Sequence, residues 1–215
     1  QSMSRPMENA YQFIKEKILD GSYKPSQKLT ENELSEVIGV SRNTIKKALL
    51  KLEQENLVEI EKNKGAFIKA YTLEEMMNYL EIREVLEGLV ARTATKNIRD
   101  VELNKLEEIL EQMDVSLKQN QFDEYSNLNK EFHRIMYQAS KNQQAVKILN
   151  VIRTQLSRYH FRTILIPGRN QSSFQEHKKI FEALKTYDEE LAQEAVMDHI
   201  ANVRTTIKEN FSLLL

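Results

Sequence analysis

The side chains best suited to bind a metal ion in this 215-residue chain are its four histidines, because the sequence contains no cysteine. Asn129 and His133 are spaced i, i+4, so both project from one face of a helix. His177 and His199 each lie beside apolar residues in later helical segments. A helical bundle can gather such imidazoles around an ion, and imidazole nitrogen with an amide oxygen suits zinc, nickel, manganese or iron(II). Isolated helical histidines are also common as surface or core residues, so spacing alone leaves both interpretations open.

A second candidate site is the segment 41–51, which contains four basic residues and no acidic one. Ser41 can cap a helix whose N-terminus receives a phosphate, and Arg42 and Asn43 can pair with guanine and adenine edges. Lys46 lies one turn after Arg42, where it can reach a phosphate or a base. The segment therefore predicts a helix that reads the major groove of DNA. A capping serine and a solvated lysine face would explain the helix alone equally well.

Three helical segments and a hairpin are predicted to position this basic helix. Apolar residues recur at helical spacing between residues 10 and 19. Thr30 and Glu33 form a capping box at the start of the second helix, and Ser41 caps the third. Three helices followed by a hairpin are the outline of a winged helix-turn-helix, which favours the DNA-binding interpretation.

The hairpin is predicted from two short runs, 58–60 and 66–68, that are rich in β-branched or aromatic residues. They flank Asn63-Lys64-Gly65, a sequence typical of a tight turn. Lys64 and the lysines near it make this wing basic. Gly65 has no side chain, so it permits close approach of the backbone to a groove.

The remainder of the chain shows no strand signal and predicts a bundle of helices. Apolar residues such as Leu103 and Leu106 keep helical spacing, and the low counts of 5 Gly and 3 Pro leave little room for turns. The predicted fold is mainly α, with a winged helix-turn-helix at residues 4–70 and an all-α antiparallel bundle at residues 74–213. The six helices predicted for the bundle span residues 73–97, 99–119, 121–140, 143–165, 171–186 and 188–212.

The net charge of −1 hides an uneven distribution of charge. Residues 1–70 hold 12 Lys+Arg and 10 Asp+Glu, a balance of +2, while the remainder holds 19 and 22 of the totals of 31 and 32, a balance of −3. Non-specific attraction to DNA should therefore be modest, and affinity should rest on geometry-specific contacts of a dimer. The lack of cysteine excludes disulfides and thiol catalysis. The lack of a long apolar run or leader pattern predicts a soluble, cytoplasmic protein with no membrane partner.

Residues 14–69 resemble the winged-helix domain of GntR-type transcriptional regulators. The resemblance is carried mainly by Gly39-Val40-Ser41-Arg42-Asn43-Thr44-Ile45-Lys46-Lys47-Ala48-Leu49 and by Asn63-Lys64-Gly65-Ala66-Phe67-Ile68. It implies that Ser41, Arg42, Asn43, Lys46 and Gly65 occupy operator-contacting positions, and we expect Lys64 to join them on the wing.

Two residues depart from the pattern of that family. Asn32 stands where members often carry an arginine that contacts a base or phosphate, and Lys46 replaces the usual arginine. Lysine lacks the planar fork of arginine. Both departures imply a different operator or weaker discrimination between bases.

Residues 74–212 resemble the helical effector domain of the FadR subfamily of GntR regulators, the FCD domain. The matching stretches are Glu81-Ile82-Arg83-Glu84-Val85-Leu86-Glu87, Asn129-Lys130-Glu131-Phe132-His133, Glu176-His177-Lys178-Lys179-Ile180 and Met197-Asp198-His199. The metal ligands that the resemblance implies are Asn129, His133, His177 and His199. Six helices rather than seven imply the VanR-like branch of that subfamily.

Asn129 replaces the aspartate that is commoner in the family, which removes one negative charge from the implied ligand set. Zinc or nickel is the expected ion, with manganese or iron as alternatives. His160 falls outside the motif, and we expect it to have a structural or pocket-wall role. Arg83 either binds a carboxylate effector or pairs with a glutamate to lock neighbouring helices.

The function expected from these observations is that of a ligand-responsive, DNA-binding transcriptional regulator. It would act as a homodimeric repressor on a palindromic double-stranded operator, and a small organic acid or sugar acid would bind in the bundle near the metal. The first alternative is a metal-dependent enzyme, in which the three histidines activate a water molecule. The second alternative is a regulator whose histidine cluster holds no metal.

Overall fold

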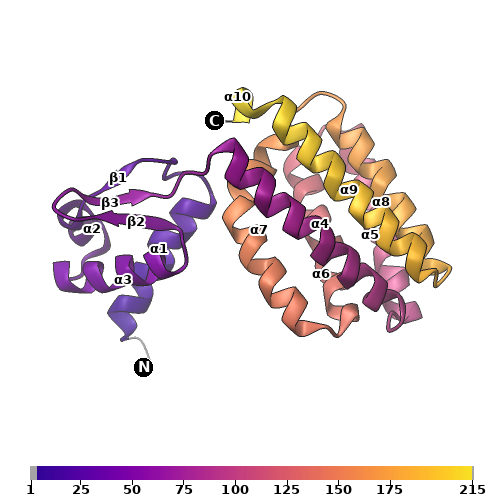
Figure 1. The fold of residues 1–215 in the computed structure, drawn as a ribbon, viewed down its shortest axis with the longest axis horizontal. Helices are drawn as coiled ribbons and strands as arrows, with labels where there is room; N and C mark the ends of the chain where they lie inside the picture. Colours follow the sequence, from indigo (N-terminus) through magenta and orange to yellow (C-terminus); the bar gives the residue numbers. More distant parts are fainter. Residues whose placement is uncertain (1–3, 215) are drawn as a thin grey trace. The chain divides into compact units, whose positions relative to one another are not determined.

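The computed structural model describes residues 4–214, and for residues 158–162 and 214 it describes the backbone alone. The chain divides into two compact units, Gln1–Thr72 and Leu73–Leu215, named the N-terminal unit and the C-terminal unit (Figure 1). Among the described residues, no helix is both long and apolar enough to cross a membrane.

The N-terminal unit is the winged helix-turn-helix that the sequence predicts. Its core is formed by side chains such as Ile14, Ile45 and Leu52, which are 0% exposed, and α1 packs against α3 through them. The elements follow in the order α1 (Arg5–Leu19), β1 (Lys28–Leu29), α2 (Glu31–Ile38), α3 (Arg42–Gln54), β2 (Val58–Glu61) and β3 (Gly65–Ile68).

The starts of α2 and α3 are fixed by the two predicted caps. The Thr30 hydroxyl accepts a hydrogen bond from the backbone N–H of Glu33 at 3.3 Å, and the Ser41 hydroxyl accepts one from Thr44 at 3.2 Å. Gly39 adopts a left-handed conformation with φ 76°, which turns the chain sharply between the two helices. The basic helix therefore begins at a defined residue, with its first backbone N–H groups close to Ser41.

The sheet has three antiparallel strands in the order β1-β3-β2, whereas the sequence predicts only the β2–β3 hairpin. Val58 pairs with Ile68 and Glu61 pairs with Gly65, so the tip of the wing lies between Glu61 and Gly65. β1 contains only two residues, too few to show an alternating pattern, and it forms because Lys28–Leu29 meets the free edge of β3.

The C-terminal unit is a helical bundle, and the six long helices predicted from the sequence are confirmed. Its described residues form no strand. α8 begins at Arg169, two residues earlier than predicted, because Gly168 already turns the chain with φ 79°. The helices are α4 (Leu73–Thr95), α5 (Asp100–Lys118), α6 (Phe122–Ser140), α7 (Gln143–Thr163), α8 (Arg169–Lys185), α9 (Glu189–Glu209) and the short α10 (Phe211–Leu214).

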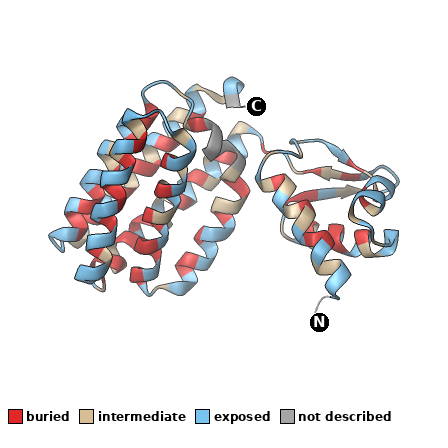
Figure 2. Cartoon of the chain, turned by 180° about the vertical axis from the view of Figure 1, so that it is seen from behind, coloured by how far each residue is buried: buried red, intermediate tan, exposed pale blue. Residues whose placement is uncertain are grey.

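α4 is the central helix of this bundle, because it packs against α6, α7 and α9. Buried residues lie along the inward faces of the helices, where the ribbon is red in Figure 2. Gly88 permits the close approach of α9: a Cβ atom at this position would lie 2.8 Å from the Met197 Cγ atom. α4 also carries two buried charged residues, Arg83 and Glu87, toward the interior of the unit.

Candidate metal centre and nucleic-acid interface

Three histidines from three different helices meet inside the C-terminal unit: His133 on α6, His177 on α8 and His199 on α9. One nitrogen of each ring lies within 4.8 Å of the other two, and all three side chains are buried. The Nε2 atoms of His133 and His177 are 3.3 Å apart. The structure thus brings together the three histidines that the sequence motif selects. The side chain of His160 lies outside the described residues.

Hydrogen bonds at Nδ1 determine which nitrogen remains available on two of the rings. Nδ1 of His177 lies 2.6 Å from the backbone carbonyl oxygen of Ser173, which can only accept, so Nδ1 carries the proton. Nδ1 of His199 lies 2.5 Å from Glu176 Oε2 and donates to that carboxylate. In a neutral ring the other nitrogen, Nε2, then keeps its lone pair for a metal ion.

The third ring, His133, faces a buried carboxylate on α4. Its Nδ1 atom lies 3.4 Å from Glu87 Oε2, and neither atom has a hydrogen-bond partner among the described residues. The other Glu87 oxygen accepts a hydrogen bond from Arg83 Nε at 2.7 Å. Burial opposes ionisation of Glu87, yet the Arg83 guanidinium holds the pKa of this carboxyl well below its usual value. An ionised Glu87 favours the proton on Nδ1 of His133, which leaves Nε2 available here too.

All three imidazoles are neutral at pH 7. Burial lowers the pKa of His133 to about 4, with Glu87 opposing this shift. Burial and the neighbouring His199 lower the pKa of His177 to about 3, and burial lowers that of His199 to about 4. A neutral imidazole is the form that binds metal, so no proton has to be displaced at neutral pH.

The geometry of the cluster fits a divalent metal ion. Two nitrogens on one tetrahedral ion, each about 2.0–2.1 Å from it, are about 3.3 Å apart, which matches the separation of the His133 and His177 Nε2 atoms. Without an ion, three lone pairs would face one another in a buried space. Asn129 lies one helical turn before His133, and its Oδ1 atom is buried without a hydrogen-bond partner among the described residues. The three imidazoles can therefore hold an ion, and the unpartnered Asn129 oxygen, on the same helix face as His133, suits the fourth ligand that the family resemblance implies.

A second carboxylate supports the cluster from α8. Glu176 accepts two hydrogen bonds from the Arg169 guanidinium, at 3.1 and 2.9 Å, and a third from Asn202 at 2.9 Å. Burial opposes ionisation of Glu176, but its bonds to His199 and Arg169 lower its pKa to about 2. This carboxylate therefore stays charged and orients the His199 ring.

One further cation borders the cluster, Arg153 on α7. Its guanidinium donates a hydrogen bond to the Tyr137 hydroxyl and lies 5.2 Å from the centroid of that ring. The Tyr137 ring is in turn 5.9 Å from the His133 ring. Arg153 is half-buried, and it lies close enough to Glu87 and His133 to influence the ionisation of both.

The predicted DNA-contacting side chains of α3 lie on its exposed surface. Arg42, Asn43 and Lys46 are exposed, while Ile45 and Ala48 on the opposite side are fully buried in the core. Side chains directed away from the core are free to enter a groove, with Arg42 and Asn43 on the first turn of the helix.

The wing carries the other two predicted residues. Gly65 has φ 109°, a conformation that favours glycine, and it opens β3. Lys64 is exposed and pairs with Glu61 at 2.7 Å across the turn. This exposed ion pair contributes little to stability, so Lys64 can exchange Glu61 for a phosphate at small cost.

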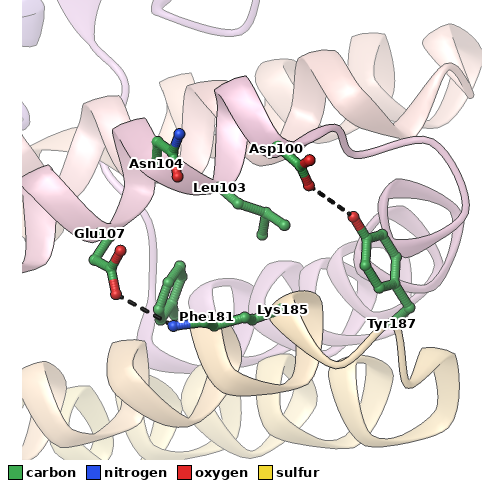
Figure 3. Close-up of a pocket in the computed structure, with 7 residues that line it drawn as sticks. All are labelled: Asp100, Leu103, Asn104, Glu107, Phe181, Lys185 and Tyr187. Atoms are coloured by element: carbon green, nitrogen blue, oxygen red, sulfur yellow. Dashed lines mark hydrogen bonds and ion pairs between the residues drawn. The ribbon is translucent and has the colours of Figure 1, made fainter.

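A separate surface pocket of about 190 Å³ lies between α5 and the end of α8 (Figure 3). Polar groups at its rim pair with each other: Lys185 Nζ lies 3.3 Å from Glu107 Oε1, and the Tyr187 hydroxyl lies 3.4 Å from Asp100 Oδ1, to which it donates. The pocket shares no residue with the histidine cluster. It is lined by Asp100, Leu103, Asn104, Glu107, Phe181, Lys185 and Tyr187.

The residues that support the histidines have no role assigned from the sequence: Glu87, Glu176, Ser173 and Arg153. Glu87 could have been found from its position four residues after Arg83, where a helical ion pair is expected. Glu176 precedes His177 directly and gives no such signal, because its partners come from α9 and from the start of α8.

Comparisons with known proteins agree with both units. Residues 6–68 match the model of bacterial regulatory proteins of the gntR family, and residues 78–202 match the FCD domain. The HTH-type transcriptional repressor RspR of Escherichia coli is 23% identical over 93% of this chain and 87% of its own. The galactonate operon transcriptional repressor of Escherichia coli is 27% identical over 89% of this chain and 92% of its own. The gluconate operon transcriptional repressor of Bacillus licheniformis is 24% identical over 91% of this chain and 82% of its own.

Solved structures share the fold. Escherichia coli McbR/YncC superposes with a TM-score of 0.75 at 18% identity, covering 99% of this chain and 98% of its own. A GntR regulator of Rhodococcus sp. RHA1 also superposes with a TM-score of 0.75 at 18% identity, covering 96% of this chain and 99% of its own. The family and these relatives are transcriptional regulators rather than enzymes. The chain belongs to the GntR family of bacterial regulatory proteins, and it combines their DNA-binding domain with an FCD domain.

Proposed function

We propose that this chain is a metal-containing repressor that binds a palindromic operator as a homodimer and responds to a small organic-acid or sugar-acid effector. The observation that carries the proposal is the convergence of three neutral imidazoles in a domain attached to a DNA-binding winged helix. The names of two relatives support the effector class, since galactonate and gluconate are sugar acids.

The ion in this proposal is zinc or nickel, held by Asn129, His133, His177 and His199. Imidazole nitrogen suits both ions, and manganese or iron(II) are the alternatives that a metal analysis would reveal. When bound, the ion supplies a positive charge that can accept an oxygen of an anionic effector. The role of the protein is to orient the rings, through Glu87 and Glu176, and to keep the surroundings of the ion buried.

A homodimer is supported by apolar side chains that lie exposed on two adjacent helices. α4 and α7 pack against each other. Val85 on α4 is 63% exposed and Val151 on α7 is 61% exposed, and each lies in a stripe at helical spacing. A second copy of the chain would bury both stripes in a four-helix contact. The members of the two stripes are Ile82, Val85 and Leu89 on α4, with Ile148 and Val151 on α7.

The position of α4 supports a response to the effector. This helix begins at Leu73, directly after the N-terminal unit, and it carries Glu87 against His133. A ligand that binds better to one arrangement of α4 than to another would shift the DNA-binding competence of the dimer.

DNA binding is tested by footprinting the intact protein on the DNA upstream of its own gene. We expect protection of two half-sites related by a two-fold axis, with affinity that falls as salt rises. Lys46→Ala should weaken the footprint, whereas Lys105→Ala should leave it unchanged because Lys105 lies on the surface of α5. Binding without sequence preference would contradict the proposal.

The metal is tested by elemental analysis of untagged protein. We expect about one ion per chain, and loss of that ion in His133→Ala but not in Lys105→Ala. A full complement of metal in His133→Ala, or none in the native protein, would contradict the assigned site. Turnover of a substrate that chelation abolishes, in a protein that binds no DNA, would support the enzyme alternative.

A further inference from the structure

Among the described residues, the buried and half-buried charges around the histidine cluster do not balance, because they leave one cation without a carboxylate of its own. Arg83 faces Glu87, and Arg169 faces Glu176 through two hydrogen bonds. Each of these arginines is therefore matched by one carboxylate. Arg153 is the additional cation beside the cluster.

Arg83 and Arg153 differ in what they contact. The Arg83 side chain is 3% exposed and pairs with Glu87, four residues later on the same helix, at 2.7 Å. Arg153 comes from α7, and its hydrogen-bonded contact is the neutral Tyr137 hydroxyl. A phenol does not neutralise a guanidinium. Glu87, the carboxylate whose charge acts on Arg153, is already hydrogen-bonded to Arg83.

The implied ligand set increases this excess of positive charge. Three imidazoles and the amide of Asn129 are all neutral, so a divalent ion held by them would keep its full +2 charge. An aspartate at position 129 would have cancelled part of that charge. A buried cation without an anionic partner is costly, so the loaded cluster and Arg153 together favour an anion from solution.

We infer that Arg153 is the residue that binds the carboxylate of the effector, and that Arg83 is a positioning residue that holds Glu87 against His133. The inference rests on the proposed function, because it requires metal in the cluster. It assigns the effector contact to α7 rather than to Arg83, for which the sequence leaves effector binding and pairing with a glutamate equally open. The planar guanidinium of Arg153 can donate two parallel hydrogen bonds to a carboxylate, as arginine commonly does.

The experiment uses the full-length protein loaded with Co²⁺, whose visible absorption reports a change of ligand at the ion. Sodium acetate is titrated at constant ionic strength, with sodium perchlorate as the control salt. Four proteins are compared: wild type, Arg153→Met, Arg153→Lys and Arg134→Met. Arg134 is the matched control, because it is an exposed arginine on α6 that pairs with Glu131.

We expect Arg153→Met to bind Co²⁺ with the wild-type stoichiometry. Its affinity for acetate should be about 10- to 100-fold lower, which is the change in affinity expected from the loss of one hydrogen bond to a charged group. The acetate affinity of Arg153→Lys should be intermediate, because lysine keeps the positive charge but lacks the two parallel N–H donors of the guanidinium. Arg134→Met should match the wild type.

Equal acetate affinity in Arg153→Met and Arg134→Met, with Co²⁺ bound to both, would overturn the role of Arg153 and leave the metal site standing. Failure of the wild type to bind Co²⁺ would overturn the proposed metal site and this inference with it. If Arg153→Met does not fold, Arg153→Lys decides: acetate affinity equal to the wild type overturns the inference, and weaker affinity supports it.

Discussion

Acidification of the metal-free protein should unfold the C-terminal unit at a pH well above the range in which its carboxylates titrate. The perturbation acts on the three buried imidazoles, His133, His177 and His199, whose pKa values are lowered to about 4, 3 and 4. In the unfolded chain the same groups have pKa values of about 6.5. Between these values the unfolded chain binds more protons than the folded one, so the free energy of unfolding falls as the pH falls.

The magnitude follows from these pKa values. A pH of 5 is about 1.5 units below the pKa of an imidazole in the unfolded chain, so protonation stabilises the unfolded chain by about 2 kcal/mol per imidazole. The folded imidazoles remain almost fully neutral at this pH. Three such groups remove about 6 kcal/mol, compared with a total stability of about 5–15 kcal/mol for a typical domain. Glu87 and Glu176 have lowered pKa values, so they add a further loss only when the pH falls below about 4.5.

The assay is urea denaturation of chelator-treated, full-length protein, followed by far-ultraviolet circular dichroism at a series of pH values. The four histidines all lie in the C-terminal unit, so the transition of the N-terminal unit provides an internal reference. His177→Gln should remove about a third of the pH dependence between pH 7 and 5. A free energy of unfolding that stays constant within about 1 kcal/mol over that range would refute the reasoning.

Three further changes test other parts of the molecule. Arg42→Ala should weaken operator binding by about 1–3 kcal/mol and relax the preference for one base; gel shifts with operator variants measure both, and unchanged binding would exclude a base contact. Gly88→Ile should lower the free energy of unfolding by about 1–3 kcal/mol, because its side chain would overlap Met197, and Gly88→Ala should cost less because it adds only the one atom that meets Met197 Cγ. Glu176→Gln should weaken metal binding by about 10- to 100-fold, since it removes the charge that orients His199; competition with a chelating dye measures this, and equal affinity would show that the carboxylate is dispensable.

The fold was predictable wherever local signals determine it. Thr30 and Ser41 could be recognised as caps because their hydrogen bonds reach only three residues along the chain. The long helices followed from apolar spacing in the same way. β1 could not be predicted, because Lys28–Leu29 becomes a strand only through its contact with β3, about 40 residues later.

The site was predictable only in part, for a related reason. The motif around Asn129 and His133 selects residues on one helix face, and the family resemblance links them to the later histidines. The supporting groups are defined by contacts between helices: Glu87 faces His133 from 46 residues earlier, and Arg153 reaches Tyr137 across 16 residues. Neither spacing carries a periodic signal, so side-chain roles of this kind emerge only from the packed structure.

The cost of burying these groups is what can make the cluster a sensor. Within the described part of the chain, the cluster contains neutral imidazoles, an amide oxygen that lacks a hydrogen-bond partner and an arginine hydrogen-bonded to a phenol, and burying such groups lowers the stability of the metal-free domain. Ligands that satisfy them stabilise the arrangement they bind, by about 2.7 kcal/mol at a concentration 100 times the Kd. That is comparable to the coupling of about 1–3 kcal/mol typical of allosteric proteins. Glu87 belongs to α4, and the first residue of α4 follows the N-terminal unit directly. A signal that travels along the chain to the DNA-binding domain must therefore pass through α4. Stabilisation of the cluster acts on this same helix.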